Sequence, residues 1–172
     1  MKKVVGILGV LGIAAIIIIS GSAVATWVYV TVYDYDDCVN IDYIERAPDG
    51  YHATLGINVA PPPPYGLLGS VILGLGSSNK MPPSTDFTVF ADVYWGGNAE
   101  RETYEVLVGD NVNPFVSVGS ADDQGDHDFT TPSTPGKEYQ YIKIEATSGE
   151  PPVPSDPIYG PEIDAVGWDK PP

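Results

Sequence analysis

The densest run of side chains that could do chemistry lies between Ser120 and Asp128. Its last seven residues hold four carboxylates, one glutamine and one histidine, and Gly125 among them permits a sharp turn. The carboxylates belong to Asp122, Asp123, Asp126 and Asp128. Oxygen-rich loops of this kind suit Ca²⁺, which takes six to eight oxygen ligands. The four aspartates are therefore candidate ligands of a calcium ion, and the alternative is an acidic hairpin loop that faces solvent.

Other residue combinations point away from metal or reaction chemistry. The run from Asp34 to Asp37 is a weaker candidate cation site, and the longer acidic loop does not match the spacing of an EF-hand. Zinc is disfavoured because His52, His127 and Cys38 are too few and too far apart to supply its preferred ligands. Neither histidine belongs to a nucleophile motif such as Gly-x-Ser-x-Gly. We therefore predict no catalytic residues, no cofactor other than the candidate Ca²⁺, and no enzymatic activity.

The composition limits the partners and the fold class. The chain carries a formal net charge of −15 over its 172 residues. This charge disfavours nucleic acid and anionic lipid as partners, because both are bound by clustered Lys and Arg. Cys38 is the only cysteine, so it is either a packed small hydrophobe or a thiol that pairs between chains. The 19 glycines, 17 prolines and 11 tyrosines favour a β protein rich in turns.

Alternating side chains predict the secondary structure. Aromatic or threonine side chains alternate with valines over residues 26–35, which indicates a β-strand. A hairpin is expected over 39–59 with its turn at 47–50, and further short strands continue to residue 165. The sequence thus predicts a mainly β protein, with an antiparallel β-sandwich over 26–166 and a Pro-rich tail over 167–172. Several tyrosines could be exposed on strand faces, where they would form a subunit interface or bind glycan, although packing inside the sandwich is the commoner outcome. These tyrosines are Tyr29, Tyr33, Tyr139 and Tyr141.

Residues 1–25 form a hydrophobic leader of different character. Lys2 and Lys3 precede an uncharged apolar run over 4–19, and small residues follow over 20–25. The leader can be read as a cleaved secretory signal or as an uncleaved anchor that meets the membrane through residues 4–32. It can also be read as a helix that packs in the core of a filament. All three interpretations predict export to the cell surface or the extracellular space.

Two parts of the chain resemble known families. The short basic head, Gly6 and the long uncharged run that leads directly into a β domain resemble the start of archaeal type IV pilin and archaellin precursors. That resemblance implies cleavage after a small residue and a filament built from bundled N-terminal helices. Residues 141–146, followed by Gly149, Ser155 and Pro157, resemble the final strand pair of a fibronectin type III or other Ig-like module. The two resemblances together imply an N-terminal hydrophobic helix followed by an Ig-like antiparallel β-sandwich.

These observations predict a non-enzymatic structural protein of the cell surface. The main hypothesis is a pilin-like extracellular filament subunit that self-associates through its N-terminal hydrophobic helix. The alternative is a secreted or membrane-anchored β-sandwich module for binding or adhesion, which would use the acidic loop or the tyrosines to hold a ligand, a glycan or a partner. Such a module could also assemble by donating the strand over 26–35 to the open sheet edge of a neighbour.

Overall fold

The computed structural model describes residues 26–45, 47–58, 66–91, 101–149 and 160–170. The predicted leader over 1–25 lies outside these residues. Within the described ranges, no helix is long and apolar enough to cross a membrane.

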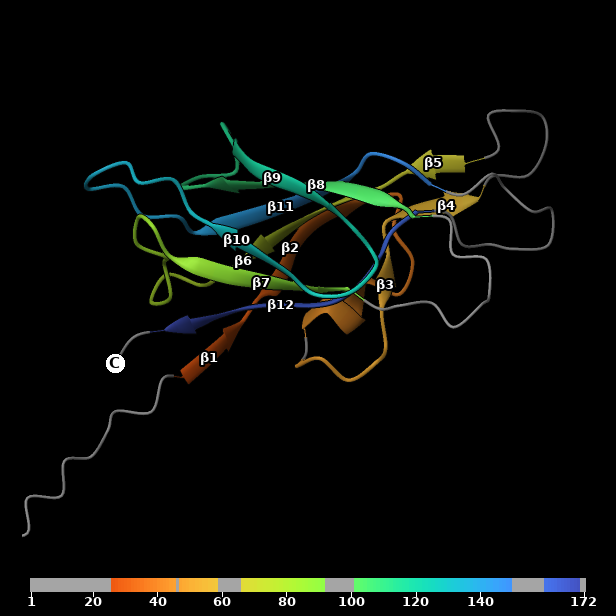
Figure 1. Cartoon of the computed structure of the whole chain (residues 1–172), viewed down its shortest axis with the longest axis horizontal. Coiled ribbons are helices and arrows are strands. Elements are labelled where there is room, and N and C mark those ends of the chain that lie inside the picture. The colour runs from red at the N-terminus through yellow and green to blue at the C-terminus, as the bar shows by residue number, and fades with distance from the viewer. Residues whose placement is uncertain (1–25, 46, 59–65, 92–100, 150–159, 171–172) are drawn as a thin grey trace, which may run out of the picture.

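Two antiparallel sheets pack against each other and form a β-sandwich (Figure 1). The first, sheet A, has the strand order β1 (Thr26–Tyr29), β12 (Glu162–Lys170), β7 (Asp86–Ala91) and β10 (His127–Thr130), and β3 (Ala53–Thr54) pairs with β12. The second, sheet B, has the order β2 (Thr31–Asp36), β6 (Ser70–Gly74), β11 (Tyr141–Ala146), β8 (Thr103–Gly109) and β9 (Val116–Asp122). A small ribbon of β4 (Gly56–Asn58) and β5 (Gly66–Leu68) lies beside them, and η1 (Ile41–Glu45) is a short 3₁₀ helix.

The core lies between the two sheets because every second side chain of the long strands is apolar. In β7, β8 and β11, buried residues alternate with more exposed ones, as the period of two in a strand requires. Phe87 of β7, Val106 of β8 and Ile144 of β11 are at most 1% exposed. Burying a side chain of this size stabilises the fold by roughly 1.5–3 kcal/mol. The predicted mainly β sandwich is therefore confirmed.

The chain crosses from one sheet to the other at both edges of the sandwich. Residues 26–36 begin in sheet A as β1 and continue in sheet B as β2, and the crossing residue between them, Val30, is 1% exposed. On the opposite edge, β9 ends in sheet B and β10 begins in sheet A. Figure 1 shows β9 and β10 on the near side of the molecule. Each edge of the sandwich is thus closed by a continuous segment of chain.

Three details differ from the sequence-based expectations. Residues 41–45 form η1 instead of a hairpin strand, and the residue before them, Asn40, has a positive φ of 56° that ends extended backbone. β12 continues to Lys170, so the predicted tail over 167–172 is wrong for its first four residues, and Trp168 among them is 2% exposed. The single strand expected over 26–35 is divided into β1 and β2, which belong to different sheets. Of the tyrosines that could be exposed, Tyr139 has the alternative outcome and is packed in the core, being 1% exposed.

Candidate functional site

Three aromatic rings lie together on the outer face of sheet A, and we call Trp27, Tyr29 and Phe90 the aromatic surface. Trp27 and Tyr29 alternate on β1 with Val28, which packs against the core, so both rings point away from it. The ring centroids of Trp27 and Tyr29 are 6.4 Å apart with an interplanar angle of 21°. The centroid of Phe90 on β7 lies 5.8 Å from that of Trp27. Trp27 is nevertheless 44% exposed, so the rings remain accessible to a ligand.

A glycine of β12 makes room for these rings between β1 and β7. Gly167 pairs with Tyr29 on one side and with Thr88 on the other. A Cβ atom at this position would lie 3.0 Å from the Trp27 ring and 3.3 Å from the Tyr29 ring. Any side chain larger than hydrogen would therefore push the two rings away from the sheet. The backbone at Gly167 forms the base on which the aromatic surface rests.

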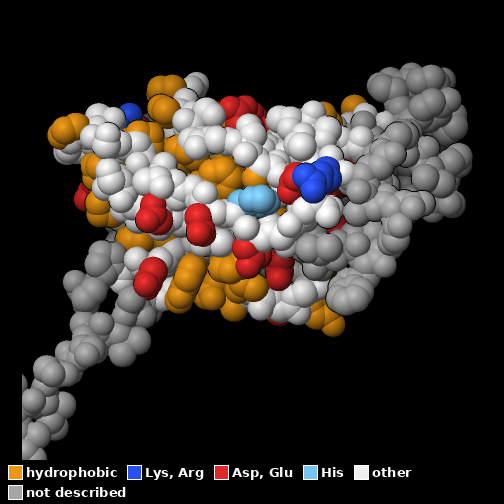
Figure 2. Space-filling view, in the orientation of Figure 1, with side chains coloured by type: hydrophobic (Ala, Val, Ile, Leu, Met, Phe, Trp, Pro, Cys, Tyr) orange, Lys and Arg blue, Asp and Glu red, His pale blue; other side chains and the backbone are white. Residues whose placement is uncertain are grey.

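Carboxylates and hydroxyl groups border the aromatic surface on the same face of sheet A. The Thr88 hydroxyl donates a hydrogen bond to Asp128 Oδ1 at 2.7 Å, and the Thr130 hydroxyl donates one to Asp86 Oδ1 at 2.6 Å. Both aspartates are exposed, so their second carboxylate oxygens face solvent as acceptors. Figure 2 shows hydrophobic side chains flanked by acidic ones along the lower margin of the molecule, over β7 and β12. The face combines flat apolar rings with fixed hydrogen-bond acceptors.

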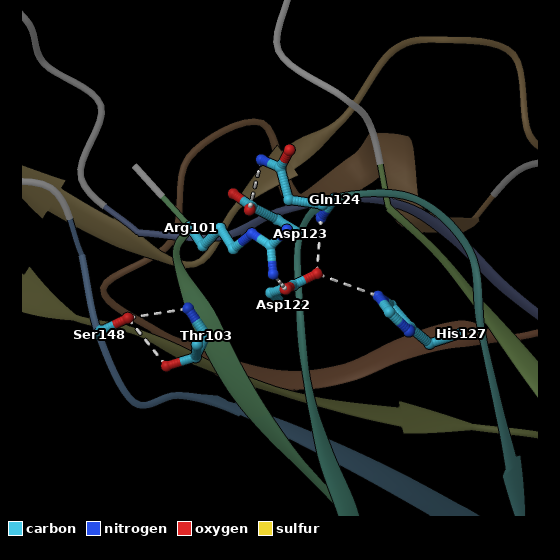
Figure 3. A network of polar contacts seen from close by, with 7 residues as sticks. All are labelled: Arg101, Thr103, Asp122, Asp123, Gln124, His127 and Ser148. Carbon is cyan, nitrogen blue, oxygen red and sulfur yellow. Dashed lines mark hydrogen bonds and ion pairs between the residues drawn. The ribbon is translucent and has the colours of Figure 1, made fainter. Parts of the chain in front are cut away.

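The acidic loop predicted as a calcium site lies at the edge of the sandwich where β9 leads to β10, and Figure 3 shows its polar contacts. Asp122, at the end of β9, lies between two basic groups: its Oδ2 is 3.4 Å from Arg101 Nη1, and its Oδ1 is 3.3 Å from His127 Nε2. The His127 contact makes no hydrogen bond, so it is ionic only when the imidazole is protonated. The Gln124 backbone N–H donates to Asp122 Oδ1 at 3.2 Å and closes a turn. The loop is thus held by the backbone amide of Gln124 and by the guanidinium of Arg101, which precedes β8.

Asp123 is the buried member of this loop, being 7% exposed. Its backbone N–H donates to the Glu102 carbonyl oxygen at 3.0 Å, which ties the loop to the start of β8. Burial raises the pKa of the Asp123 carboxyl above its ordinary value, and the negative charge of Glu162 acts in the same direction. The side chain of Gln124, in hydrogen-bond contact with the carboxylate, opposes this rise in pKa. Ionising Asp123 therefore costs stability at neutral pH.

The four aspartates predicted as Ca²⁺ ligands do not gather into one metal-binding group. Among the described residues, no cluster of three or more His, Cys, Asp or Glu could hold a metal ion. Asp122 pairs with Arg101, and Asp128 lies on the outer face of sheet A with Thr88. Asp126 is exposed at the turn. The calcium site, including the weaker candidate over residues 34–37, stays a prediction without support from this arrangement.

The predicted donor strand over 26–35 is paired within its own chain. β1 pairs with β12 and β2 pairs with β6. Side chains of the same chain also bond to backbone N–H groups of β2: Val32 donates to Glu45 Oε1 at 2.6 Å, and Tyr35 donates to Asp34 Oδ1 at 3.0 Å. Occupied edge donors and acidic side chains are features that discourage strand addition. Donation of this strand to a neighbour is therefore not supported.

Cys38 behaves as a packed thiol. Its Sγ donates hydrogen bonds to the carbonyl oxygens of Asp36 at 3.2 Å and Ser70 at 3.4 Å. Burial, which outweighs the bond to Asp36, raises the pKa of the thiol to about 12. At neutral pH the group is protonated and a poor nucleophile. This arrangement favours the packed interpretation over a thiol that pairs between chains.

Phe90 of the aromatic surface and Gly167 beneath it were not singled out by the sequence. Phe90 follows the outward positions of an alternating strand, so the period of two contained a signal for its exposure. Gly167 carried no comparable signal, because nothing local shows which rings will lie over a glycine. Trp27 and Tyr29 were correctly placed on one side of their strand, whereas Tyr139 donates its hydroxyl to the Pro132 carbonyl oxygen at 3.3 Å within the core.

Comparisons with known proteins return solved structures of low sequence identity. No family model matches the chain, and no curated protein matches it. It is similar to the CBM32 of AlyQ in complex with 4,5-unsaturated mannuronic acid, at 14% identity and a TM-score of 0.48, over 84% of this chain and 95% of that one. It is also similar to GH31 CBM32-2 bound to GalNAc, at 14% identity and a TM-score of 0.37, over 60% and 66%. A Ruminococcus gnavus GH29 fucosidase in complex with fucose matches at 13% identity and a TM-score of 0.39, over 59% of this chain and 18% of the fucosidase.

Each of these three structures is at most 14% identical to this chain and has a TM-score of at most 0.48, so they assign it to no family. The resemblance of the leader to pilins and archaellins stays a prediction, because its residues lie outside the described ranges.

Proposed function

We propose that this protein is a non-enzymatic binding module that holds neutral carbohydrate on its aromatic surface. The observation that carries the proposal is the cluster of Trp27, Tyr29 and Phe90, with ring centroids 5.8–6.4 Å from Trp27, on the outer face of sheet A. A sugar ring presents apolar C–H groups on its faces and hydroxyl groups at its rim. Flat aromatic rings with polar groups at their border complement both features.

The border of the aromatic surface supports a ligand rich in hydroxyl groups. Asp86 and Asp128 each accept one hydrogen bond from a neighbouring threonine, which holds the carboxylates in position. Hydrogen bonds to charged acceptors are stronger than those between neutral groups, and positioned acceptors lose little entropy on binding. The sugar hydroxyls would donate to these oxygens while a ring face lies on Trp27.

The charge of the protein favours neutral over acidic glycans. The net charge of −15 repels anionic polymers, and Asp86, Asp128 and Asp169 on the exposed side of sheet A strengthen that repulsion locally. A neutral polysaccharide carries no charge to be repelled and offers many donors. Export to the cell surface, as the leader predicts, would place the module where such glycans occur.

Titration of soluble neutral oligosaccharides, followed by tryptophan fluorescence and calorimetry, tests this proposal. We expect saturable binding by the wild type and at least tenfold weaker binding by Trp27→Ala. Tyr35→Ala is the matched control, because Tyr35 is 54% exposed on β2 in the other sheet and should leave affinity unchanged. Binding that survives Trp27→Ala, or no binding by a wild type screened across neutral hexose and pentose polymers, would overturn the proposal.

A further inference from the structure

A second pair of aromatic rings lies outside the aromatic surface, on η1 and the loop that follows it. Tyr43 of η1 and Tyr51 of the following loop have ring centroids 5.4 Å apart with an interplanar angle of 34°. We call these two residues the tyrosine pair. Tyr51 is 60% exposed, the largest exposed fraction of any large hydrophobic side chain in the described part of the chain. A pair of adjacent, tilted rings that remains so accessible can act as a second aromatic contact surface.

A buried carboxylate of β12 fixes the loop that carries Tyr51. Asp164 is 7% exposed and accepts hydrogen bonds from the backbone N–H groups of Asp49 at 3.3 Å and Gly50 at 3.1 Å. Asp49 in turn accepts a hydrogen bond from the Tyr51 backbone N–H at 3.0 Å. Gly50 supplies the positive φ of 81° that this turn requires. The loop is therefore held in one shape before any ligand arrives, which reduces the entropy lost on binding.

Both aromatic groups are anchored on the same strand. Gly167 of β12 lies under the aromatic surface, and Asp164, three residues earlier, holds the loop of the tyrosine pair. A regular strand rises about 3.3 Å per residue, so these anchor points are at most about 10 Å apart, because the register shifts at Asp164. In Figure 1, β1 and the short orange helix η1 lie on the same side of β12. The segments that carry the two aromatic groups thus follow one another along β12.

We propose that the ligand is an unbranched neutral oligosaccharide that lies along β12 and contacts the aromatic surface and the tyrosine pair at once. This inference rests on the proposed function and adds the length of the ligand to it. One sugar unit lies on Trp27, and a unit further along the same chain lies on Tyr51. A disaccharide is too short to engage both groups fully, so affinity rises with chain length until both are occupied. A linked second contact strengthens binding because it is intramolecular.

The experiment compares short and long members of three neutral series by calorimetry: cellobiose with cellohexaose, mannobiose with mannohexaose, and xylobiose with xylohexaose. For the series that binds, we expect the hexaose to bind at least tenfold more tightly than the disaccharide. Tyr51→Ala lowers the affinity for the hexaose about tenfold and leaves the affinity for the disaccharide unchanged, whereas Trp27→Ala lowers both affinities. Tyr51→Phe keeps the ring and the hexaose affinity. Tyr33→Ala is the matched control, because Tyr33 is 59% exposed on β2.

The outcomes separate the two proposals. If the wild type binds none of the six sugars, the aromatic surface is not a site for these chains, and both proposals fail together. If it binds disaccharide and hexaose equally and Tyr51→Ala changes neither affinity, the extended site is wrong and the aromatic surface remains. Thermal melting of each variant shows that the fold is intact, and a Tyr51→Ala melting point equal to that of the wild type attributes its effect to contact.

Discussion

The two edges where the chain crosses between the sheets are built from opposite kinds of side chain. At the β1–β2 crossing, the inward residue is the buried Val30, and aromatic rings face outward. At the β9–β10 crossing, the buried position next to the turn is the carboxyl of Asp123, and Arg101 offsets the charge of its neighbour Asp122. At the first edge, apolar rings are exposed to solvent, where a ligand can cover them. At the second edge, a carboxyl group is buried, and only neighbouring groups of the fold can offset the cost of its desolvation.

This difference assigns different roles to the two edges. The contact between the Trp27 and Phe90 rings in the aromatic edge involves no charged group, so it should not change with pH near neutrality. The acidic edge holds Tyr104 beneath its carboxylates, and burial together with the charges of Asp122, Asp123 and Asp126 raises the pKa of that phenol. We therefore expect substitutions at the acidic edge to change stability in a manner that depends on pH and salt. Substitutions at the aromatic edge should not show that dependence.

The largest effect is expected from placing a charge at the apolar crossing. Val30→Asp buries a carboxylate where the structure provides an apolar core, and should lower the free energy of unfolding by about 4 kcal/mol or more. Urea unfolding followed by circular dichroism measures the change. Tyr35→Asp on the adjoining strand is exposed and should cost less than about 1 kcal/mol. Equal losses for the two variants would contradict the assignment of Val30 to the core.

Removing a buried charge at the acidic crossing, by Asp123→Asn, should stabilise the protein. Since the folded-state pKa of Asp123 is raised, the folded state binds more protons than the unfolded state between the ordinary pKa, about 3.9, and the raised value. Stability due to this group is therefore highest below that window and falls as pH rises through it. Asp123→Asn should raise the melting temperature at pH values near 7 by a few degrees.

The pH dependence of this gain is its control. Near pH 3 the Asp123 carboxyl is protonated in both states, so the difference in melting temperature between Asp123→Asn and wild type should shrink toward zero. Asp126→Asn, at an exposed position of the same loop, should show a smaller gain at neutral pH. A lower melting temperature for Asp123→Asn at neutral pH would show that the buried charge is compensated.

A smaller effect is expected for the tyrosines on the outer face of sheet B. Tyr33 of β2 and Tyr141 of β11 form an edge-to-face pair with centroids 5.2 Å apart. A double-mutant cycle to leucine should give a coupling energy of about 0.5–1 kcal/mol, measured by urea unfolding and independent of salt. A coupling energy near zero would mean that contact between the two exposed rings contributes nothing to the free energy of unfolding.

The smallest effect should come from removing the Arg101 side chain at the acidic edge. Arg101 is 73% exposed, and an exposed ion pair contributes between zero and about 1 kcal/mol. Arg101→Ala should therefore cost less than about 1 kcal/mol at low salt and nothing measurable in 1 M NaCl, because salt screens surface charges. Arg101→Lys keeps the charge and serves as its control. A loss that persists in high salt would indicate that the Arg101 contact to Asp122 is structural.

The sequence by itself determined the local features of this protein. The period of two over residues 26–35 gave the outward aromatic side, because alternation in a strand depends only on neighbouring residues. Further short strands were predicted up to residue 165, and β7, β8 and β11 among them show the same alternation. The strand prediction was wrong over 41–45, where positive φ angles at Asp37 and Asn40 interrupt extended backbone and a 3₁₀ helix follows.

Only the tertiary structure decided which local features meet. Trp27, Phe90 and Gly167 belong to three distant segments, and pairing of β1 and β7 to β12 brings them together. The same long-range pairing buries Tyr139 through its bridge to Met81 and separates Asp128 from Asp122 by placing them in different sheets. The physical reason is that strand pairing and burial depend on contacts between remote residues, whereas alternation depends on adjacent ones. The aromatic surface on β12 is therefore a property of the fold, although each of its rings is visible in the sequence.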